Sequence, residues 1–426
     1  MSGGNRRVLV LAPFPPGGQP AHGGGTAIAQ LVRSLSRRNR VALAYLRASD
    51  ESPADPSLAD CCERLIESPR SGTSGSSVRP LWRLPRMVPR VAAGHPLWAA
   101  SRWSPPFARL LDTLCASWKP DVVQAEFGAM GMYLRPARRA GARTVVTFHD
   151  PEAAAAAERA ARTQGAERLM WRLEATLWHR FSSRLLGSVD AAIAFTARDA
   201  SSLAALHPGA PVTIVPLGAD VPNEPIDGGS APLLLFVGNF NHPPNVDAAK
   251  YLVEDLFPRV RAHHAGVEIA LVGDRPPPWL VSRAGDGVHV PGFVPDLQPL
   301  MRSAAVFVAP LRHGGGMRLK VVEALAAGKA VVGTSRAFEG TGVVHDRHAL
   351  VADDPEGQCA AILRLLGDPA ARVALGREAR AHIAATLSWD RAAAGYEAVY
   401  DRLLDRSAAP APPVGLAAPG RPTRAR

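Results

Sequence analysis

The chain has 426 residues, enough for two domains of ordinary size, and 47% of its residues are apolar while 20% are charged. These proportions are close to average globular usage, so they exclude global disorder and collagen-like repetition. The 49 Lys and Arg residues outnumber the 38 Asp and Glu residues, which gives a net charge of +11. That balance favours polyanions, anionic lipid surfaces or phosphorylated small molecules as partners.

Cysteine usage and the N-terminal segment together predict a cytoplasmic protein. The four cysteines are Cys61, Cys62, Cys115 and Cys359. They include no C-x-x-C pair, so neither a disulfide framework nor a zinc knuckle is supported. Arg6 and Arg7 precede only about seven apolar residues before a Pro-Gly stretch, which favours a buried strand over a signal peptide. No window of about 18 uncharged apolar residues occurs, so we expect any membrane contact to be peripheral, at the inner face.

Short apolar runs alternate with helix-length segments along most of the chain. Such runs are typical of strands that are buried on both faces of a parallel sheet. In the first half we predict strands at residues 8–11, 41–46, 122–125, 144–148, 191–195 and 212–215. A second series is predicted at residues 233–237, 267–272, 288–290, 306–309, 330–332 and 349–351.

This alternation predicts two doubly wound, Rossmann-like α/β domains that face each other across a cleft. Residues 216–232 separate the two series and carry four Pro and three Gly, which is typical of an interdomain linker. We therefore place an N-terminal domain at 1–217 and a C-terminal domain at 218–387. A late helix at about 388–405 and a disordered, Pro/Ala/Arg-rich tail at 406–426 complete the chain.

Residues 78–109 form the most basic segment, with six Arg, no acidic residue, and Trp82, Trp98 and Trp103. Such a segment fits a surface that rests on an anionic membrane or grips a lipid-linked acceptor. It also fits basic amphipathic helices whose Trp side chains pack into the domain core, and we favour this structural interpretation. The preceding Ser/Gly-rich stretch, 68–77, is predicted to be a mobile loop.

Glycines cluster after the first predicted strand, at residues 17–18 and 23–25, and a helical run follows them. Successive glycines let backbone N–H groups approach an anion at a helix N-terminus. The spacing matches neither G-x-G-x-x-G nor the Walker A motif. A phosphate-binding loop and a simple tight turn from strand to helix therefore both stay open, with Gly24 and Gly25 as the candidate ligand contacts.

His149 follows the predicted strand at 144–148, at the carboxyl edge of the sheet where this architecture binds ligands. A neutral imidazole can donate or accept a hydrogen bond with a sugar hydroxyl or a phosphate, so we predict a functional role for His149. Asp150 precedes Pro151 at a predicted helix start. We expect Asp150 to be a helix N-cap rather than a base.

The densest candidate site lies in residues 310–332, where a strand end, three consecutive glycines and a helix predicted at about 317–327 follow one another. Arg318 and Lys320 fall in the first turn, where cations oppose the helix macrodipole, and this placement makes sense if an anion binds there. Glu323 can share the face of Lys320 and point its carboxylate toward ribose hydroxyls while the cations hold a diphosphate.

On these motifs the chain resembles glycosyltransferase family 4, whose members are retaining, nucleotide-sugar-dependent enzymes of GT-B fold. The matching segments are residues 121–123, 149–150, 214–220, 233–239, 244–245, 267–273, 290–294, 306–310, 314–324 and 389–404. The resemblance extends to about residue 405, and it is more specific in the second half than in the first. It implies that the late helix packs back onto the N-terminal domain.

The sequence departs from the family pattern at three places. Of the two glutamates that the family has with seven residues between them, Glu323 matches the second, which contacts the donor ribose. The first falls on Gly315, so the acidic side chain expected near the transferred sugar is missing. Asn239 and Pro244 stand where the family has Arg and Lys. These departures resemble a subgroup with the loop Gly-x-Gly-x-Arg-x-Lys, in which the two basic residues would replace the missing diphosphate ligands.

The resemblance implies roles for individual residues of this sequence. Arg318, Lys320 and His149 would be catalytic, and Gly24 and Gly25 would approach the transferred sugar from the N-terminal domain. The remaining donor-binding residues would be Gly238, Asn239, Gly273, Phe293, Val294, Gly315, Gly316, Met317, Leu319 and Glu323.

The implied reaction transfers a hexose from a nucleoside diphosphate sugar to a hydroxyl acceptor with retained configuration. Because no D-x-D pattern lies near a strand end, we expect no metal, and we expect no cofactor besides the donor. The acceptor would be a glycan, a lipid-linked sugar or a natural product, and no nucleic acid is expected. The alternatives are a nucleotide-sugar epimerase of GT-B type, a non-enzymatic polyanion-binding protein and a nicotinamide-dependent dehydrogenase. The high Ala, Arg and Pro content suggests a GC-rich bacterial source.

Overall fold

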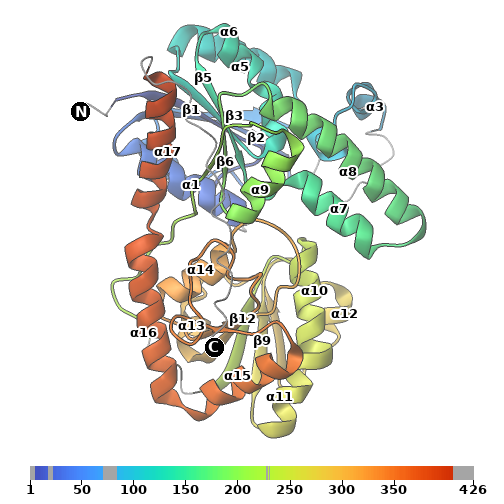
Figure 1. The fold of residues 1–426 in the computed structure, drawn as a ribbon, viewed down its shortest axis with the longest axis vertical. Coiled ribbons are helices and arrows are strands. Elements are labelled where there is room, and N and C mark those ends of the chain that lie inside the picture. The colour runs from blue at the N-terminus through green and yellow to red at the C-terminus, as the bar shows by residue number, and fades with distance from the viewer. Residues whose placement is uncertain (1–4, 18–22, 71–83, 227–228, 230, 406–426) are drawn as a thin grey trace, which may run out of the picture.

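The chain forms two parallel α/β units, one above the other along the long axis of the molecule (Figure 1). The computed structural model describes residues 5–17, 23–70, 84–226, 229 and 231–405. Within those residues the first sheet has seven strands in the order β3-β2-β1-β4-β5-β6-β7, and the second has six in the order β10-β9-β8-β11-β12-β13. All neighbouring strands are parallel, so the predicted pair of doubly wound sheets is confirmed.

The elements of the first unit follow the predicted alternation. Its strands are β1 (Arg7–Ala12), β2 (Arg40–Arg47), β3 (Arg64–Pro69), β4 (Val122–Glu126), β5 (Arg143–Phe148), β6 (Ala191–Ala194) and β7 (Val212–Ile214). Its helices are α1 (Gly23–Ser36), α2 (Leu58–Cys61), α3 (Leu84–Ala92), α4 (Leu97–Ser101), α5 (Pro105–Trp118), the 3₁₀ helix η2 (Gly128–Tyr133), α6 (Arg135–Arg139), α7 (Glu152–Arg162), α8 (Gly165–Leu186) and α9 (Ala197–Leu206).

The second unit repeats the same plan. Its strands are β8 (Ala231–Val237), β9 (Glu268–Val272), β10 (Val288–Gly292), β11 (Ala304–Ala309), β12 (Val331–Gly333) and β13 (Leu350–Val351). Its helices are α10 (Pro243–Tyr251), the π-helical turn η3 (Leu252–Leu256), α11 (Phe257–His263), α12 (Pro278–Val281), α13 (Gln298–Ser303), α14 (Leu319–Ala326), α15 (Pro355–Gly367) and α16 (Pro369–Thr386). The last helix is α17 (Trp389–Leu404).

The strand predictions hold wherever the strand is buried on both faces, and they miss one strand at the edge of the sheet. Residues 8–11 in β1 and 306–309 in β11 are almost fully buried, as expected for continuous apolar runs. The missed strand is β3, which pairs only with β2, and its sequence mixes charged and apolar residues because much of it faces solvent. Ser68 and Pro69 end this strand rather than begin the predicted loop, and residues 71–77 of that loop lie outside the described residues.

The helix α17 leaves the second unit and packs against α1 of the first, along one side of the molecule (Figure 1). Glu397 accepts hydrogen bonds from Arg38 at 2.9 Å and from Asn39 at 2.7 Å, and Tyr400 donates to Gln124. The packing of the late helix on the N-terminal unit therefore agrees with the expectation from the resemblance.

The chain crosses between the two units twice, and the two crossings lie side by side. Ala219 and Ser388 form a parallel bridge, and the amide of Ala219 donates to Leu387 at 2.7 Å. The predicted division at residues 217 and 218 falls in the first of these crossings. Among the described helices, none combines the length and the apolar character that a membrane span requires. The predicted disordered tail, 406–426, lies outside the described residues.

Candidate active site between the two sheets

The carboxyl ends of the strands of both sheets turn toward the boundary between the units, and the two units touch there. A Cβ placed on Gly316, in the loop after β11, would overlap the carbonyl oxygen of His149 at the end of β5. A Cβ on Gly23, at the start of α1, would lie 3.9 Å from the Cβ of Leu319, at the start of α14. Two helix N-termini and two strand ends therefore meet in one place, where parallel α/β sheets bind ligands.

His149 is held rigidly at this boundary. Its Nε2 lies 2.6 Å from Oε2 of Glu126, and its ring stacks on Phe127 with centroids 3.9 Å apart. Only 9% of the His149 side chain and 1% of the Glu126 side chain are exposed. A Cβ on Gly24 would lie 2.8 Å from the Phe127 ring, so only glycine lets α1 approach so closely. The structure thus brings the two predicted sugar-side elements together.

Glu126 was missed by the sequence analysis, although it is the last residue of β4. Its neighbour in the sheet is β5, whose end carries His149. Parallel strands end at the same edge, and this rule predicts that a polar residue one position beyond the apolar run at 122–125 lies beside His149. A carboxylate in this position fixes the orientation of an imidazole ring.

The three consecutive glycines after β11 face carboxylates of the first unit. The amide of Gly314 donates to Glu158 Oε2 at 2.9 Å, and the amide of Gly316 donates to Asp199 Oδ2 at 3.0 Å. The carboxylate of Asp150 accepts a hydrogen bond from the backbone of Gly315. The predicted N-cap role of Asp150 is therefore wrong, because α7 begins after Pro151 and has no side-chain cap.

The helix α14 begins two residues later than predicted. Arg318 is the residue before the helix and adopts a non-helical conformation, so only Lys320 lies in the first turn. The Arg318 guanidinium donates to the carbonyl of His313 at 3.2 Å and to that of Gly315, while its buried Nε has no partner among the described residues. Burial lowers the pKa of Arg318. No side chain caps the helix start.

Lys320 and Glu323 share one face of α14, as predicted, with Nζ of the lysine 2.8 Å from Oε2 of the glutamate. Their side chains are 38% and 34% exposed, so both remain accessible to a ligand in the cleft. This pair follows directly from the helical spacing of three residues. Met317 and Leu319 are buried, and the sulfur of Met317 accepts a hydrogen bond from the amide of Leu217 at 3.1 Å.

The predicted nucleotide-side residues lie together at the ends of three adjacent strands. The amide of Gly238, after β8, donates to Val272 at 2.9 Å, and that of Gly273, after β9, donates to Gly292 at the end of β10 at 2.9 Å. A Cβ on Gly273 would overlap the carbonyl of Gly238, so this edge admits no side chain there. Phe293 is next along the edge and is 41% exposed, with Val294 partly buried behind it. Asn239 accepts hydrogen bonds from Asn241 and Asn245 at 2.8 and 2.9 Å.

The site contains acids whose ionisation is unfavourable. Burial raises the pKa of Asp150 to about 6, with Arg318 opposing the rise and Asp199 adding to it. Burial raises the pKa of Glu152 to about 8, and the neighbouring Asp150 adds to the rise. Burial and the nearby charge of Arg318 lower the pKa of His242 to about 4. Carboxylic acids and a neutral imidazole with perturbed pKa values are typical of ligand-binding clefts.

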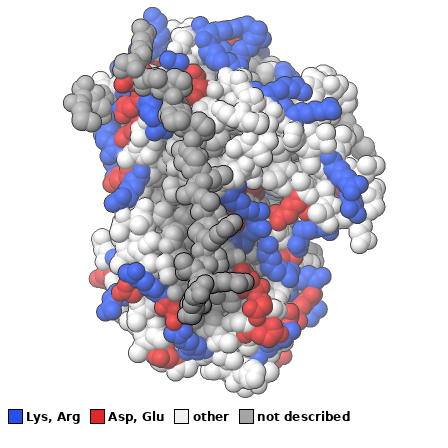
Figure 2. Space-filling model, in the orientation of Figure 1, with Lys and Arg blue, Asp and Glu red and all other residues white. Residues whose placement is uncertain are grey.

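Ion pairs join the two units beside this site. Arg162 of α7 lies 2.6 Å from Asp247 of α10, which also pairs with Arg312 at 2.8 Å, and Arg198 lies 3.3 Å from Glu339. Figure 2 shows basic and acidic side chains side by side at the boundary between the units. Within the described parts of the chain, no group of three or more His, Cys, Asp or Glu residues is arranged to hold a metal ion. Metal independence stays a prediction.

The tryptophans of the basic segment that the structure describes pack inside the first unit. Trp98 contacts Trp178 and Phe127, with centroids 6.2 and 5.8 Å apart, and Trp103 stacks on Tyr133 at 5.1 Å. The structural interpretation of this segment is therefore the better one for these two residues, and Trp82 lies outside the described residues.

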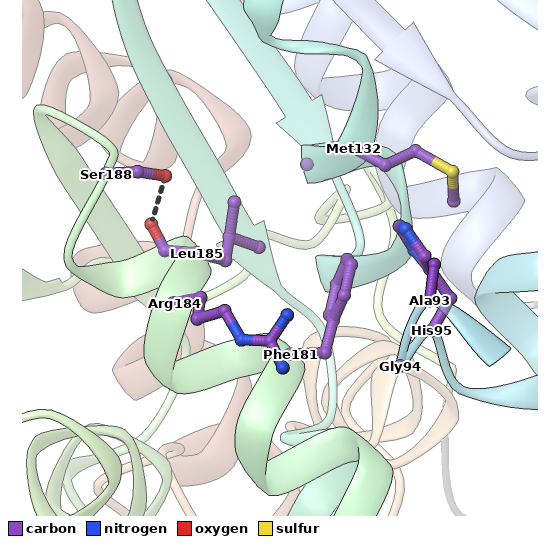
Figure 3. A pocket seen from close by; sticks show the side chains of 9 residues that line it. Ala93, Gly94, His95, Met132, Phe181, Arg184, Leu185 and Ser188 are labelled. Atoms are coloured by element: carbon purple, nitrogen blue, oxygen red, sulfur yellow. Dashed lines mark hydrogen bonds between the residues drawn. The ribbon is translucent and has the colours of Figure 1, made fainter. Parts of the chain in front are cut away.

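A pocket of about 180 Å³ opens beside this segment, between η2, α8 and the residues after α3 (Figure 3). Phe181 and Leu185 of α8 and Met132 of η2 give it apolar walls, and Arg184 lies at its edge. The ring of His95 packs on Phe181 with centroids 5.4 Å apart. Burial and the charges of nearby arginines lower the pKa of His95. The pocket thus combines apolar walls with one cationic side chain, that of Arg184.

Comparisons with known proteins agree with this geometry. Residues 21–222 match the family model described as "Glycosyltransferase Family 4", and residues 231–368 match "Glycosyl transferases group 1". The chain is 28% identical over 248 residues to a lipopolysaccharide core biosynthesis mannosyltransferase, LpcC, of Rhizobium leguminosarum, with 53% of this chain and 68% of the relative covered. It is 32% identical over 177 residues to a phosphatidyl-myo-inositol mannosyltransferase of Mycolicibacterium smegmatis, with 38% and 44% covered.

Solved structures show the same fold. Sucrose-phosphate synthase from Thermosynechococcus elongatus superposes with a TM-score of 0.69 at 18% identity, covering 94% of this chain and 99% of that one. HepE from Anabaena, solved in complex with UDP and glucose, superposes with a TM-score of 0.61 at 14% identity, covering 92% and 98%. These matches do not favour the epimerase, polyanion-binding or dehydrogenase alternatives.

Proposed function

Because this protein is a glycosyltransferase of the GT-B fold, and by class a hexosyltransferase, we propose that it moves a hexose from a nucleoside diphosphate sugar to a hydroxyl acceptor with retained anomeric configuration and without a metal. The observation that carries the proposal is the uncapped start of α14, where Arg318 and Lys320 stand next to the strand end that bears His149. A diphosphate carries the negative charge that a helix N-terminus and two cations would bind.

The start of α14 offers two kinds of attraction to an anion. The first N–H groups of a helix lack partners within the helix, and the macrodipole adds positive potential there. Arg318 supplies a guanidinium whose Nε has no partner within the described residues, and Lys320 supplies a half-exposed ammonium. Both cations would stabilise the charge that develops on the leaving diphosphate, which replaces the role of a metal in this reaction.

The rest of the donor fits around this anchor. Glu323, one turn along α14, would accept hydrogen bonds from the ribose, and the base would lie along the edge formed by Gly238, Gly273 and Phe293. The sugar would then point toward His149 and the start of α1. Retention requires attack from the same face as the departing diphosphate, so the acceptor hydroxyl would approach the sugar on the diphosphate side.

We further propose that the acceptor is amphipathic and anionic and that the protein binds the inner membrane face peripherally while remaining cytoplasmic. The apolar and aromatic walls of the pocket at His95, with the cation of Arg184 at its edge, support this proposal. Sedimentation with vesicles that contain anionic lipid tests it. Arg184→Glu should lower the bound fraction, whereas Arg283→Glu, on an exposed turn of the second unit, should not. No binding to such vesicles by the unaltered protein would contradict the proposal.

The donor is tested first by thermal unfolding with UDP, GDP, dTDP and their sugars, each with and without EDTA. Both named relatives are mannosyltransferases, so GDP-mannose heads the panel. A ligand that binds only the folded state raises the melting temperature. We expect one nucleotide to do so in EDTA, and Glu323→Ala to weaken its binding by about 1–3 kcal/mol because a buried ribose contact is lost. NMR of the product then reads the anomeric configuration. No shift with any nucleotide would refute the donor site.

A further inference from the structure

Position 315 is the one place in the glycine loop where the carboxylate of another residue occupies the space of a side chain. A Cβ added to Gly315 would overlap Oδ1 of Asp150, and it would lie 3.3 Å from the Cγ of the same residue and 3.1 Å from Oδ1 of Asp199. A residue with a side chain at 315 would therefore displace the Asp150 carboxylate. The carboxylate of Asp150, from the first unit, thus fills the space that a side chain at position 315 of the second unit would occupy.

The three carboxylates that face the loop differ in the number of partners that they already have. Asp199 accepts from Thr196 at 2.7 Å in addition to Gly316, and its amide donates to the side chain of Thr196, the N-cap residue of α9, at 3.0 Å. Glu158 accepts from Gly314 and lies 4.0 Å from Arg336. The backbone of Gly315 stabilises the ionised form of Asp150, and no other hydrogen bond to this carboxylate is found among the described residues.

Of the three carboxylates, Asp150 is also the best placed to contact a bound sugar. It directly follows His149, and the positive charge of Arg318 acts on it. An ionised carboxylate has about four acceptor positions, so one hydrogen bond from Gly315 leaves room for a sugar hydroxyl. Such a bond is charge-assisted and strong inside a cleft.

We propose that Asp150 binds a hydroxyl of the transferred sugar, so that the acidic contact to the sugar comes from the N-terminal unit and not from the glycine loop. This inference rests on the proposed function, since it assumes a sugar between His149 and Arg318. It explains why residue 315 is glycine: the loop must admit the carboxylate of Asp150. The contact would be made only when the two units are together.

The test moves the carboxylate from one unit to the other. Asp150→Ala should lower kcat/KM for the donor about 10- to 100-fold, the range expected for a hydrogen bond to a charged group, while affinity for the nucleotide alone stays within about twofold. Gly315→Glu alone should also be impaired, because its side chain meets Asp150. In the double variant Asp150→Ala/Gly315→Glu the overlap is gone and a carboxylate is present again, so we expect at least a tenfold recovery over Asp150→Ala.

A matched pair of charge-neutralising variants separates sugar binding from loop support. Asp150→Asn and Glu158→Gln each retain an oxygen that can accept from the loop amide, but only the first removes the negative charge from the proposed sugar contact. We expect Asp150→Asn to lose turnover and Glu158→Gln to keep it within about threefold. Donors that lack single hydroxyls complete the assignment: the hydroxyl bound by Asp150 is the one whose removal has no further effect in Asp150→Ala.

Three results would overturn the proposal. Equal losses in nucleotide affinity and in turnover for Asp150→Ala would show a role in the loop and not at the sugar. A double variant that melts like the unaltered protein but regains no activity would exclude a carboxylate contact at this place. If no nucleotide stabilises the unaltered protein, the proposed function itself fails, and that outcome is distinguished from the other two because it does not involve Asp150.

Discussion

Glu152→Gln should stabilise the protein, and the gain should grow as the pH rises. The Glu152 carboxylate accepts from the amide of Gly128 at 3.0 Å through Oε1, while its buried Oε2 has no partner among the described residues. Burial raises its pKa from 4.5 to about 8. A carboxyl group whose pKa is raised on folding binds a proton more tightly in the folded state, so folding becomes less favourable as the pH rises from 4.5 to 8.

The size of the effect follows from that interval. Between pH 5 and pH 7 the unfolded chain ionises almost fully while the folded protein keeps its proton, and two pH units correspond to at most about 2.5 kcal/mol at about 1.4 kcal/mol per unit. Structural relaxation, and the side-chain amide group that replaces Oε2, make the real effect smaller than this limit. We therefore expect the stability gain of Glu152→Gln over the unaltered protein to increase by about 1–2 kcal/mol between pH 5 and pH 7.

Urea unfolding at pH 5 and pH 7, monitored by a spectroscopic signal that reports on the N-terminal unit, measures this difference in the free energy of unfolding directly. Glu254→Gln, on an exposed glutamate of η3, shows how much the exchange alone changes stability. A stability difference between the unaltered protein and Glu152→Gln that is the same at both pH values would refute the reasoning, because it would mean that Glu152 ionises in the folded state without penalty.

Three further predictions concern the site and the core. Replacing Arg318 and Lys320 together by Ala should lower turnover at least about 100-fold while the fold persists, and kinetics with the identified donor check this. Gly316→Ala should destabilise the protein by about 2 kcal/mol or more and weaken donor binding, because φ is +70° and the Cβ would overlap a carbonyl of the other unit. Lys329→Met should remove a pH dependence of stability. Burial lowers the pKa of Lys329 to about 8, so the unaltered protein should gain about 1–2 kcal/mol in free energy of unfolding between pH 8 and 10, and the variant should not, as urea unfolding would measure.

Each of these has its own contradicting outcome. Turnover that survives loss of both cations would place the diphosphate elsewhere. Gly141→Ala has a similar φ of +79° but open space around it, so an equal effect there would show that backbone strain alone, and not the interface, explains the change at Gly316. A Lys329→Met variant with the same rise in stability at high pH would show that another group titrates.

The local features of this protein could be predicted from the sequence because they depend on short-range periodicity. Apolar runs of strand length, repeated between helices, predict parallel sheets, and all twelve predicted strands lie on described strands. The pairing of Lys320 with Glu323 follows from the pitch of one helix, and the glycines at 238 and 273 mark strand ends where backbone must approach backbone. The edge strand β3 was not predicted because an exposed strand carries no continuous apolar run.

The tertiary structure decided which distant residues meet. His149 and Glu126 lie on neighbouring strands, and only the strand order places the glutamate against the ring. Asp150 and Gly315 are 165 positions apart in the sequence and belong to different units, so no periodic pattern relates them, and the helix-cap signature at Asp150 predicted a role that it does not have. A periodic pattern tells which face of an element is buried, whereas a contact between two units depends on how their surfaces fit together, and that is determined only by the packing of the whole chain.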